Sequence, residues 1–228
     1  MFDGRFRKPI DLAVKPIGAL LRRTKLTPDH LTIAGMVVGA GAAVAIGFGY
    51  LRLGLVLVVL AALPDLLDGA LAKASGTASQ RGAFFDSTVD RITDALLLGG
   101  VAWYLASNES AHLTLLPFAI MAISSLISYQ RAKAESLGLE AKGGLMERAE
   151  RVTLLCIGLL FEPLLVPVLW LLLALTTITA GQRFVKVWRQ AQVAPVTLAR
   201  IELRRSRRQS RRVARTERRR TRVPRRRP

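Results

Sequence analysis

The chain has 228 residues, of which 51% are hydrophobic and 22% charged, and its formal net charge is +18. It is too apolar for an ordinary soluble domain and too charged for a chain that lies wholly within a membrane. Much of the charge is local, because residues 195–228 hold fifteen Arg and two Glu, a net charge of +13. The composition therefore predicts one membrane domain followed by a basic tail.

The N-terminal segment, residues 1–27, reads MFDGRFRKPIDLAVKPIGALLRRTKLT. Charges and prolines separate its apolar residues, so it lacks the uninterrupted apolar core of a signal peptide. This spacing predicts an amphipathic juxtamembrane helix on the membrane surface. The single cysteine, Cys156, lies in an apolar run, which predicts a small buried side chain and excludes a disulfide framework.

Six apolar runs occupy the segment 28–190, and a run of about twenty residues spans a bilayer as a helix. The third and fifth are short, and they become long enough when their helices begin near Phe84 and Met146. A soluble helical bundle is the alternative that this degree of hydrophobicity disfavours. The runs are Leu31–Tyr50, Leu53–Ala72, Ile92–Ala106, Leu113–Tyr129, Val152–Phe161 and Leu164–Phe184.

Lysine and arginine fall in alternate connections between these runs. The N-terminal segment, the connections 73–91 and 131–151, and the tail are basic, whereas connections 50–54, 107–112 and 162–167 contain Arg52 alone. Cytoplasmic loops carry the excess of Lys and Arg. We therefore expect an all-α, multi-pass cell-membrane protein with six transmembrane helices and both termini in the cytoplasm.

Four aspartates lie at the predicted cytoplasmic ends of the second and third helices. Asp65 and Asp68 are spaced i, i+3, and Asp86 and Asp90 are spaced i, i+4, so each pair projects from one helix face. The linker between the pairs is short and rich in Gly, Ser and Ala, which predicts that they face each other. Solvated acids at helix ends are the alternative. Four hard oxygen ligands in this spacing favour a site for Mg²⁺, Mn²⁺ or Ca²⁺.

A divalent cation at the membrane surface indicates phosphate chemistry on a substrate that is partly lipid. Small residues such as Gly69, Gly76 and Gly82 allow a bulky ligand to approach the backbone. They also permit close packing of helices, and the two uses are compatible.

The span from Asp65 to Asp90 reads D-x2-D-G-x2-A-K-x8-G-x3-D-x3-D. It resembles the signature of the CDP-alcohol phosphotransferases, in which an Arg stands where this chain has Lys73. Lysine keeps the charge of that position but gives up bidentate contact with phosphate. The segment LTPDHLTIAG resembles the family's LTP element before the first helix, and the similarity extends over about residues 24–189.

The connection SYQRAKAESLGLEAKGGLMERAERV is similar to the fourth–fifth helix loop of actinobacterial phosphatidylinositol phosphate synthases. Two differences are visible. Ala149 replaces the proline of an ERPER-like element, and the basic pair usually written K-A-R is swapped to Arg131-Ala132-Lys133.

The resemblance implies a six-helix membrane enzyme, usually a homodimer, that transfers the phosphatidyl group of CDP-diacylglycerol to an alcohol and releases CMP. It implies that two Mg²⁺ or Mn²⁺ ions are held by Asp65, Asp68, Asp86 and Asp90. Asp90 would also take the proton of the acceptor hydroxyl. The residues implied for the CDP-diacylglycerol site are Asp29, Thr32, Gly69, Lys73 and Ser79.

A phosphorylated acceptor requires several cations, and the matching candidates are Arg131, Lys133, Arg151 and Arg183. Each of them alone is equally well explained as a positive-inside anchor. Together they favour inositol phosphate as the acceptor. Glycerol 3-phosphate is the nearest alternative acceptor, and it would make the enzyme a phosphatidylglycerophosphate synthase. Lys73 motivates a second alternative, a non-catalytic membrane protein that retained the fold. A cation transporter is a third, although transport gives no reason for the Gly-rich turn.

The Arg-rich tail, residues 191–228, follows the last predicted helix on the cytoplasmic side. A basic segment in that place is expected to lie on anionic lipid. Nucleic acid is the less favoured partner, because no aromatic residues are interleaved with the arginines. We expect no fold of its own for this segment.

Overall fold

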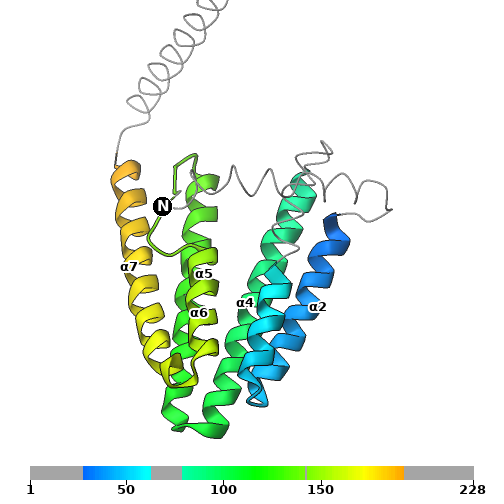
Figure 1. Ribbon diagram of the computed structural model, residues 1–228. Helices are drawn as coiled ribbons and strands as arrows, with labels where there is room; N and C mark the ends of the chain where they lie inside the picture. Colours follow the sequence, from blue (N-terminus) through cyan, green and yellow to red (C-terminus); the bar gives the residue numbers. More distant parts are fainter. Residues whose placement is uncertain (1–27, 63–78, 142, 193–228) are drawn as a thin grey trace, which may run out of the picture.

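A computed structural model describes residues 28–62, 79–141 and 143–192 (Figure 1). The described residues are mostly helical and contain no strand, and the described part of each predicted apolar run lies mainly on a helix, which confirms the all-α prediction. The N-terminal segment, most of the Arg-rich tail and four predicted site residues, Asp65, Asp68, Gly69 and Lys73, lie outside the described residues. The helices are α2 (Pro28–Gly47), Leu51–Ala62, α4 (Gln80–Asn108), α5 (Leu115–Ser136), α6 (Arg148–Leu160) and α7 (Leu165–Ala191), with 3₁₀ turns η1 (Ala111–Thr114) and η2 (Glu162–Leu164).

Three of the described helical segments are long and apolar enough to cross a membrane, namely Asp29–Gly47, Ala111–Ser136 and Glu162–Ala191. Helix α4 has 29 residues, a length of roughly 44 Å, and its charged residues all lie in its first fifteen residues. It begins at Gln80, so the third helix does start well before its apolar run. Helix α6 begins at Arg148, two residues after the position expected for the fifth helix.

The helices lie side by side and alternate in direction (Figure 1). Helices α2 and α4 begin, and α5 and α7 end, at one end of the bundle, which we call the site end. The short connections lie at the opposite end. One of these turns contains Gly49 at φ +85°, a left-handed conformation that favours glycine.

Helices α2 and α4 pack through small residues. Gly39, Ala43 and Gly47 recur at every fourth position of α2. A Cβ atom added at Gly100 of α4 would lie 2.3 Å from the carbonyl oxygen of Ala43, and one at Gly47 would lie 2.2 Å from the Trp103 ring. The backbones therefore approach as closely as in other small-residue contacts between membrane helices.

The core lies between the helices, and the outer surface is also apolar. Side chains such as Ile46, Val101 and Leu169 are fully buried. Large hydrophobic side chains are exposed on each of the six described helices, among them Val37, Phe118 and Trp170. A surface of this kind is suited to lipid rather than water.

Among the described residues, a side-chain hydrogen bond joins two elements at the end opposite the site. The Tyr104 hydroxyl of α4 donates a hydrogen bond of 2.6 Å to Oε1 of Glu162 in η2. This contact joins α4 to the connection between α6 and α7.

The α2–α4 contact predicts a contrast between two adjacent glycines. In Gly100→Ala the new methyl group meets the Ala43 backbone, so we expect a loss of about 1–3 kcal/mol. Gly99→Ala meets nothing within 4 Å and should stabilise the helix by about 0.5–1 kcal/mol. Thermal unfolding of both variants in detergent micelles checks this, and equal melting temperatures would contradict the packing described.

Candidate active site at the end of the helical bundle

Three aspartates of α4 lie on successive turns of one face. Asp86, Asp90 and Asp94 are spaced i, i+4, i+8, and all three are half-buried. The helix begins immediately after Ser79, whose Oγ accepts a hydrogen bond of 3.0 Å from the Gly82 amide and so caps it. The predicted CDP-binding residue Ser79 thus fixes where α4 starts, and the acids follow within its first four turns.

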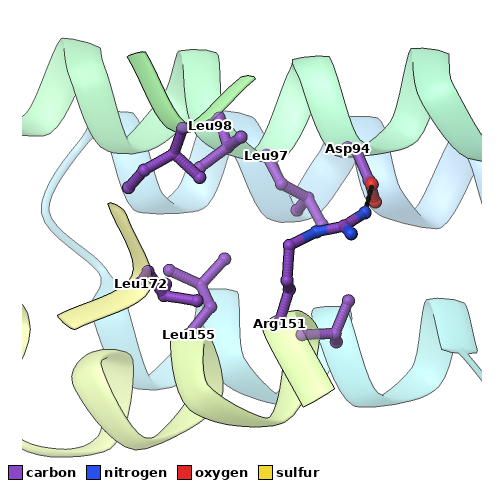
Figure 2. A pocket seen from close by; sticks show the side chains of 8 residues that line it. Asp94, Leu97, Leu98, Arg151, Leu155 and Leu172 are labelled. Atoms are coloured by element: carbon purple, nitrogen blue, oxygen red, sulfur yellow. Dashed lines mark hydrogen bonds and ion pairs between the residues drawn. The ribbon is translucent and has the colours of Figure 1, made fainter. Parts of the chain in front are cut away.

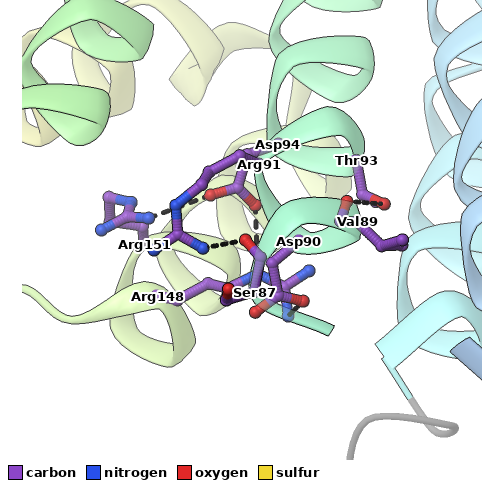
Figure 3. A network of polar contacts seen from close by, with 8 residues as sticks. All are labelled: Ser87, Val89, Asp90, Arg91, Thr93, Asp94, Arg148 and Arg151. Carbon is purple, nitrogen blue, oxygen red and sulfur yellow. Dashed lines mark hydrogen bonds and ion pairs between the residues drawn. The ribbon is translucent and has the colours of Figure 1, made fainter. Parts of the chain in front are cut away.

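Two arginines of α6 pair with these acids (Figure 3). Arg148 places Nη1 3.0 Å from Oδ1 of Asp90 and Nε 3.2 Å from Oδ1 of Asp94. Arg151 places Nη2 2.9 Å from Oδ2 of Asp94. The Asp94 and Arg151 side chains are only 18% and 12% exposed, so removing Asp94 would leave the largely buried Arg151 guanidinium without this carboxylate partner.

Arg183 joins three elements at the site end. This α7 residue is 5% exposed; its Nη1 donates to the carbonyl of Ile127 in α5 at 3.0 Å, and its Nη2 donates to the carbonyl of Gly143 at 3.1 Å. The guanidinium group therefore holds the α5–α6 connection against α7.

The same connection makes further contacts with α7. Oγ1 of Thr179 accepts a hydrogen bond of 3.1 Å from the amide of Met146. Gly144, at φ +156°, lies so close that a Cβ atom there would be 2.6 Å from Cγ2 of Thr179. Glu140 and Gln190 exchange two hydrogen bonds, of 3.0 and 2.7 Å. These contacts fix the residues that precede α6 against α7. From the first turn of α6, the Arg148 and Arg151 side chains reach α4.

A cavity of about 260 Å³ opens between α4, α5, α6 and α7 at this end. Five arginines and three acids line it, so its charge is positive and favours an anionic ligand. Its charged lining residues include Asp90, Asp94, Arg131, Arg148, Arg151 and Arg183.

Three of the four predicted acceptor residues, Arg131, Arg151 and Arg183, line this cavity together with the predicted base Asp90. The fourth, Lys133, is exposed in the last turn of α5 and is not among the residues that line it. Arg131 pairs with Glu135 at 3.1 Å on the exposed side of α5.

The other predicted residues that the structure describes lie at the same end but outside this cavity. Asp29 is in the first turn of α2, and Thr32 is buried one turn later. Ser79 precedes α4. The site end thus gathers the predicted nucleotide residues of α2 and the acids of α4.

Sequence reasoning did not assign Asp94 and Arg148 to the site. The signal for Asp94 was its i+4 spacing from Asp90, which continues the acidic face of α4 by one turn. Arg148 is the first arginine of the MERAER stretch, one turn from the predicted Arg151. Sequence spacing does not reveal that both arginines meet Asp94.

The donors at the start of α4 suit a hard divalent cation. Asp86 and Asp90 supply carboxylate oxygens, which Mg²⁺ and Mn²⁺ prefer. Within the part of the chain that the structure describes, no group of three or more His, Cys, Asp or Glu is placed to hold a metal ion. The other predicted ligands, Asp65 and Asp68, precede that part of α4 in the undescribed segment 63–78.

Residues 25–188 match the family model for CDP-alcohol phosphatidyltransferase. The chain belongs to the CDP-alcohol phosphatidyltransferase family. The match covers the described bundle up to the last residues of α7, and it confirms the resemblance found in the acidic signature.

Two curated relatives in this family carry the name phosphatidylinositol phosphate synthase. That of Corynebacterium glutamicum is 37% identical over 188 residues, which are 78% of this chain and 85% of the relative. That of Mycobacterium marinum is 37% identical over 183 residues, which are 76% of this chain and 78% of the relative.

Solved structures of the Mycobacterium tuberculosis phosphatidylinositol phosphate synthase share the fold. The crystal structure with CDP-DAG bound superposes with a TM-score of 0.72 and 34% identity over 77% of this chain and 93% of that one. The crystal structure with manganese and citrate gives a TM-score of 0.72 and 34% identity over 77% and 88%. The first therefore has a liponucleotide bound on this fold and the second a divalent cation.

The anchoring of the α5–α6 connection predicts different effects for two threonines of α7. Thr179→Val leaves the buried Met146 amide without its acceptor, which should cost about 1–3 kcal/mol and expose residues 137–147 to protease. Thr177→Val is the matched control, because this exposed hydroxyl bonds only to Leu173 of its own helix. Melting temperatures and limited proteolysis in detergent test this; equal protease sensitivity would refute the anchoring role.

Proposed function

We propose that this protein is a phosphatidylinositol phosphate synthase, which transfers the phosphatidyl group of CDP-diacylglycerol to inositol phosphate and releases CMP. The observation that carries the proposal is the convergence of Arg131, Arg151 and Arg183 on one cavity that also contains Asp90. An anion-binding wall and a carboxylate thus share a space large enough for a small phosphorylated alcohol. The names of the relatives favour inositol phosphate over glycerol 3-phosphate as that alcohol.

Arg183 supports a phosphate ligand in particular. Although its Nη1 and Nη2 bond to backbone carbonyls, its buried Nε has no hydrogen-bond partner among the described residues. That atom is closed to solvent, so Arg183 would act on a phosphate in the cavity through its charge, and the positive wall would offset the two charges of the phosphate.

The α4 acids supply the remaining chemistry. Asp86 and Asp90, with Asp65 and Asp68 of the signature, would hold the divalent ions, which stabilise the charge developing on the CMP leaving group. The acceptor hydroxyl forms a new bond to the phosphatidyl phosphorus, the bond from that phosphorus to the CMP oxygen breaks, and Asp90 accepts the hydroxyl proton. Arg148, 3.0 Å from Asp90, orients this carboxylate toward the cavity.

The nucleotide end of CDP-diacylglycerol is proposed to bind Asp29, Thr32, Gly69, Lys73 and Ser79. Asp29 and Thr32 begin α2 and Ser79 precedes α4, so the described members lie at the site end. Their place beside the start of α4 would bring the diphosphate to the acids.

Release of CMP tests this function. The purified protein in detergent receives CDP-diacylglycerol with Mg²⁺ or Mn²⁺ and, in turn, inositol phosphate, inositol and glycerol 3-phosphate. We expect release with inositol phosphate and a loss of about 10²–10⁴-fold in kcat for Asp90→Asn. Glu162→Gln, at the opposite end of the bundle, should retain activity.

Each other outcome of the CMP assay has its own meaning. Release with glycerol 3-phosphate alone would identify a phosphatidylglycerophosphate synthase. No release with any acceptor would identify a non-catalytic protein with this fold. Near-normal turnover of Asp90→Asn would remove Asp90 from the role of base.

We further propose that all six helices span the membrane, with both termini and the site end in the cytoplasm. The distribution of basic residues supports this orientation, because Arg81, Arg91, Arg131 and Arg148 lie near the site end, whereas the opposite connections carry only Arg52. Residues 1–27 would lie on the membrane surface, and the tail 191–228 on anionic lipid. A homodimer is the expected assembly.

Cysteine labelling in intact cells tests the orientation. In a Cys156→Ser background, Ser110→Cys places a thiol at the opposite end and Ser136→Cys places one at the end of α5. We expect a membrane-impermeant maleimide to label Ser110→Cys in intact cells, and Ser136→Cys only after lysis. The reversed pattern would invert the proposed topology.

A further inference from the structure

Asp94 lies one helical turn beyond Asp90 and outside the family's sequence signature. Each of its carboxylate oxygens meets a different arginine of α6, with Oδ1 3.2 Å from Nε of Arg148 and Oδ2 2.9 Å from Nη2 of Arg151 (Figure 3). A single carboxylate thus fixes two guanidinium groups that line the cavity.

The Asp94–Arg151 pair lies between two cavities. Both residues line the positive cavity and, on its other side, an apolar cavity of about 30 Å³ with Leu97, Leu98 and Leu155 (Figure 2). An apolar space of this kind offers a charged group no alternative partner. The Arg151 guanidinium is consequently held at the boundary between the two spaces.

The ion pairs of two cavity arginines differ in how deeply they are buried. The Arg131–Glu135 pair is about half exposed on both sides, at 50% and 51%, and contributes little to the position of Arg131. The Arg151–Asp94 pair is largely buried. A guanidinium has five N–H donors, so one contact with Asp94 orients Arg151 and leaves donors for an anion in the cavity.

We propose that Asp94 is a positioning residue for the acceptor phosphate. It holds Arg151, and with it Arg148, so that the phosphate of the acceptor binds beside Asp90, and it does not touch substrate. This inference rests on the proposed function. A preorganised guanidinium binds phosphate without first being ordered, which lowers the KM for the acceptor.

The charge of Asp94 makes the test discriminating. The carboxylate is negative, so its removal by itself would strengthen the attraction of the cavity for a phosphate. A weaker affinity for the acceptor after Asp94→Asn would therefore report the lost position of Arg151, whereas a simple charge effect would have the opposite sign.

The experiment measures KM for each substrate in the CMP assay. For Asp94→Asn we expect the KM of inositol phosphate to rise about tenfold or more, with the KM of CDP-diacylglycerol within about twofold of wild type. Asp94→Glu, which restores the charge, should return the acceptor KM to about threefold above wild type. Glu135→Gln is the matched control and should leave both constants unchanged.

A second background shows whether Asp94 acts through Arg151. Arg151→Gln should raise the acceptor KM, and adding Asp94→Asn or Asp94→Glu to it should raise the KM much less than in the wild-type background, because only the contact with Arg148 is then left to lose. If Asp94→Asn alone fails to fold, Asp94→Glu in the two backgrounds gives the same comparison. An acceptor KM that is unchanged or lowered by the Asp94 variants would overturn the proposal, as would an equal rise in both backgrounds.

The wild-type measurement separates the two hypotheses. Wild type that releases CMP with inositol phosphate, and Asp94 variants whose acceptor KM equals that of wild type, would together reject the positioning role but not the proposed function. Release with glycerol 3-phosphate only would reject inositol phosphate as substrate, and the same variants would then be compared with that acceptor. Absence of release with every acceptor would reject both.

Discussion

Two arginines in the first turn of α6 pair with two carboxylates of α4, in a bundle whose outer surface is largely apolar. Acids on a membrane helix are costly unless a cation or water accompanies them. Asp94 and Asp90 receive that cation from Arg148 and Arg151, and the acidic face of α4 is thereby stabilised against α6. The rest of the site end depends on this contact, because it joins α6 to α4, and Asp94 and Arg151 line both the positive cavity and the apolar cavity beside it.

The arginines at this end serve structure and ligand binding together. Arg183 joins α5 and the α5–α6 connection to α7 through two backbone carbonyls, and the same side chain lines the cavity. Because the guanidinium offers donors in several directions, one side chain can meet both demands. A lysine at this position would lack the planar fork, so the connection and the anion would compete for its single ammonium group.

Much of the fold could be predicted from the sequence, since hydropathy and length are local properties. The described parts of the six apolar runs lie mainly on helices, and α4 begins before its apolar run, as expected. The acidic signature led to the correct family. The acceptor residues were harder to predict: Arg131, Arg151 and Arg183 converge as expected, whereas Lys133 lies on an exposed part of α5, and Asp94 and Arg148 were not assigned. Spacing along a helix gives the face of a residue but not which neighbour that face meets.

The amino-acid sequence by itself determined the helices, the acidic face of α4 and the family, because each depends on residue type and on spacing within one segment. The tertiary structure alone decided which cations reach which acids. That outcome depends on how Thr179 and Arg183 hold the connection that leads into α6. These contacts join residues far apart in the chain, and no local pattern encodes the rotation of one helix against another.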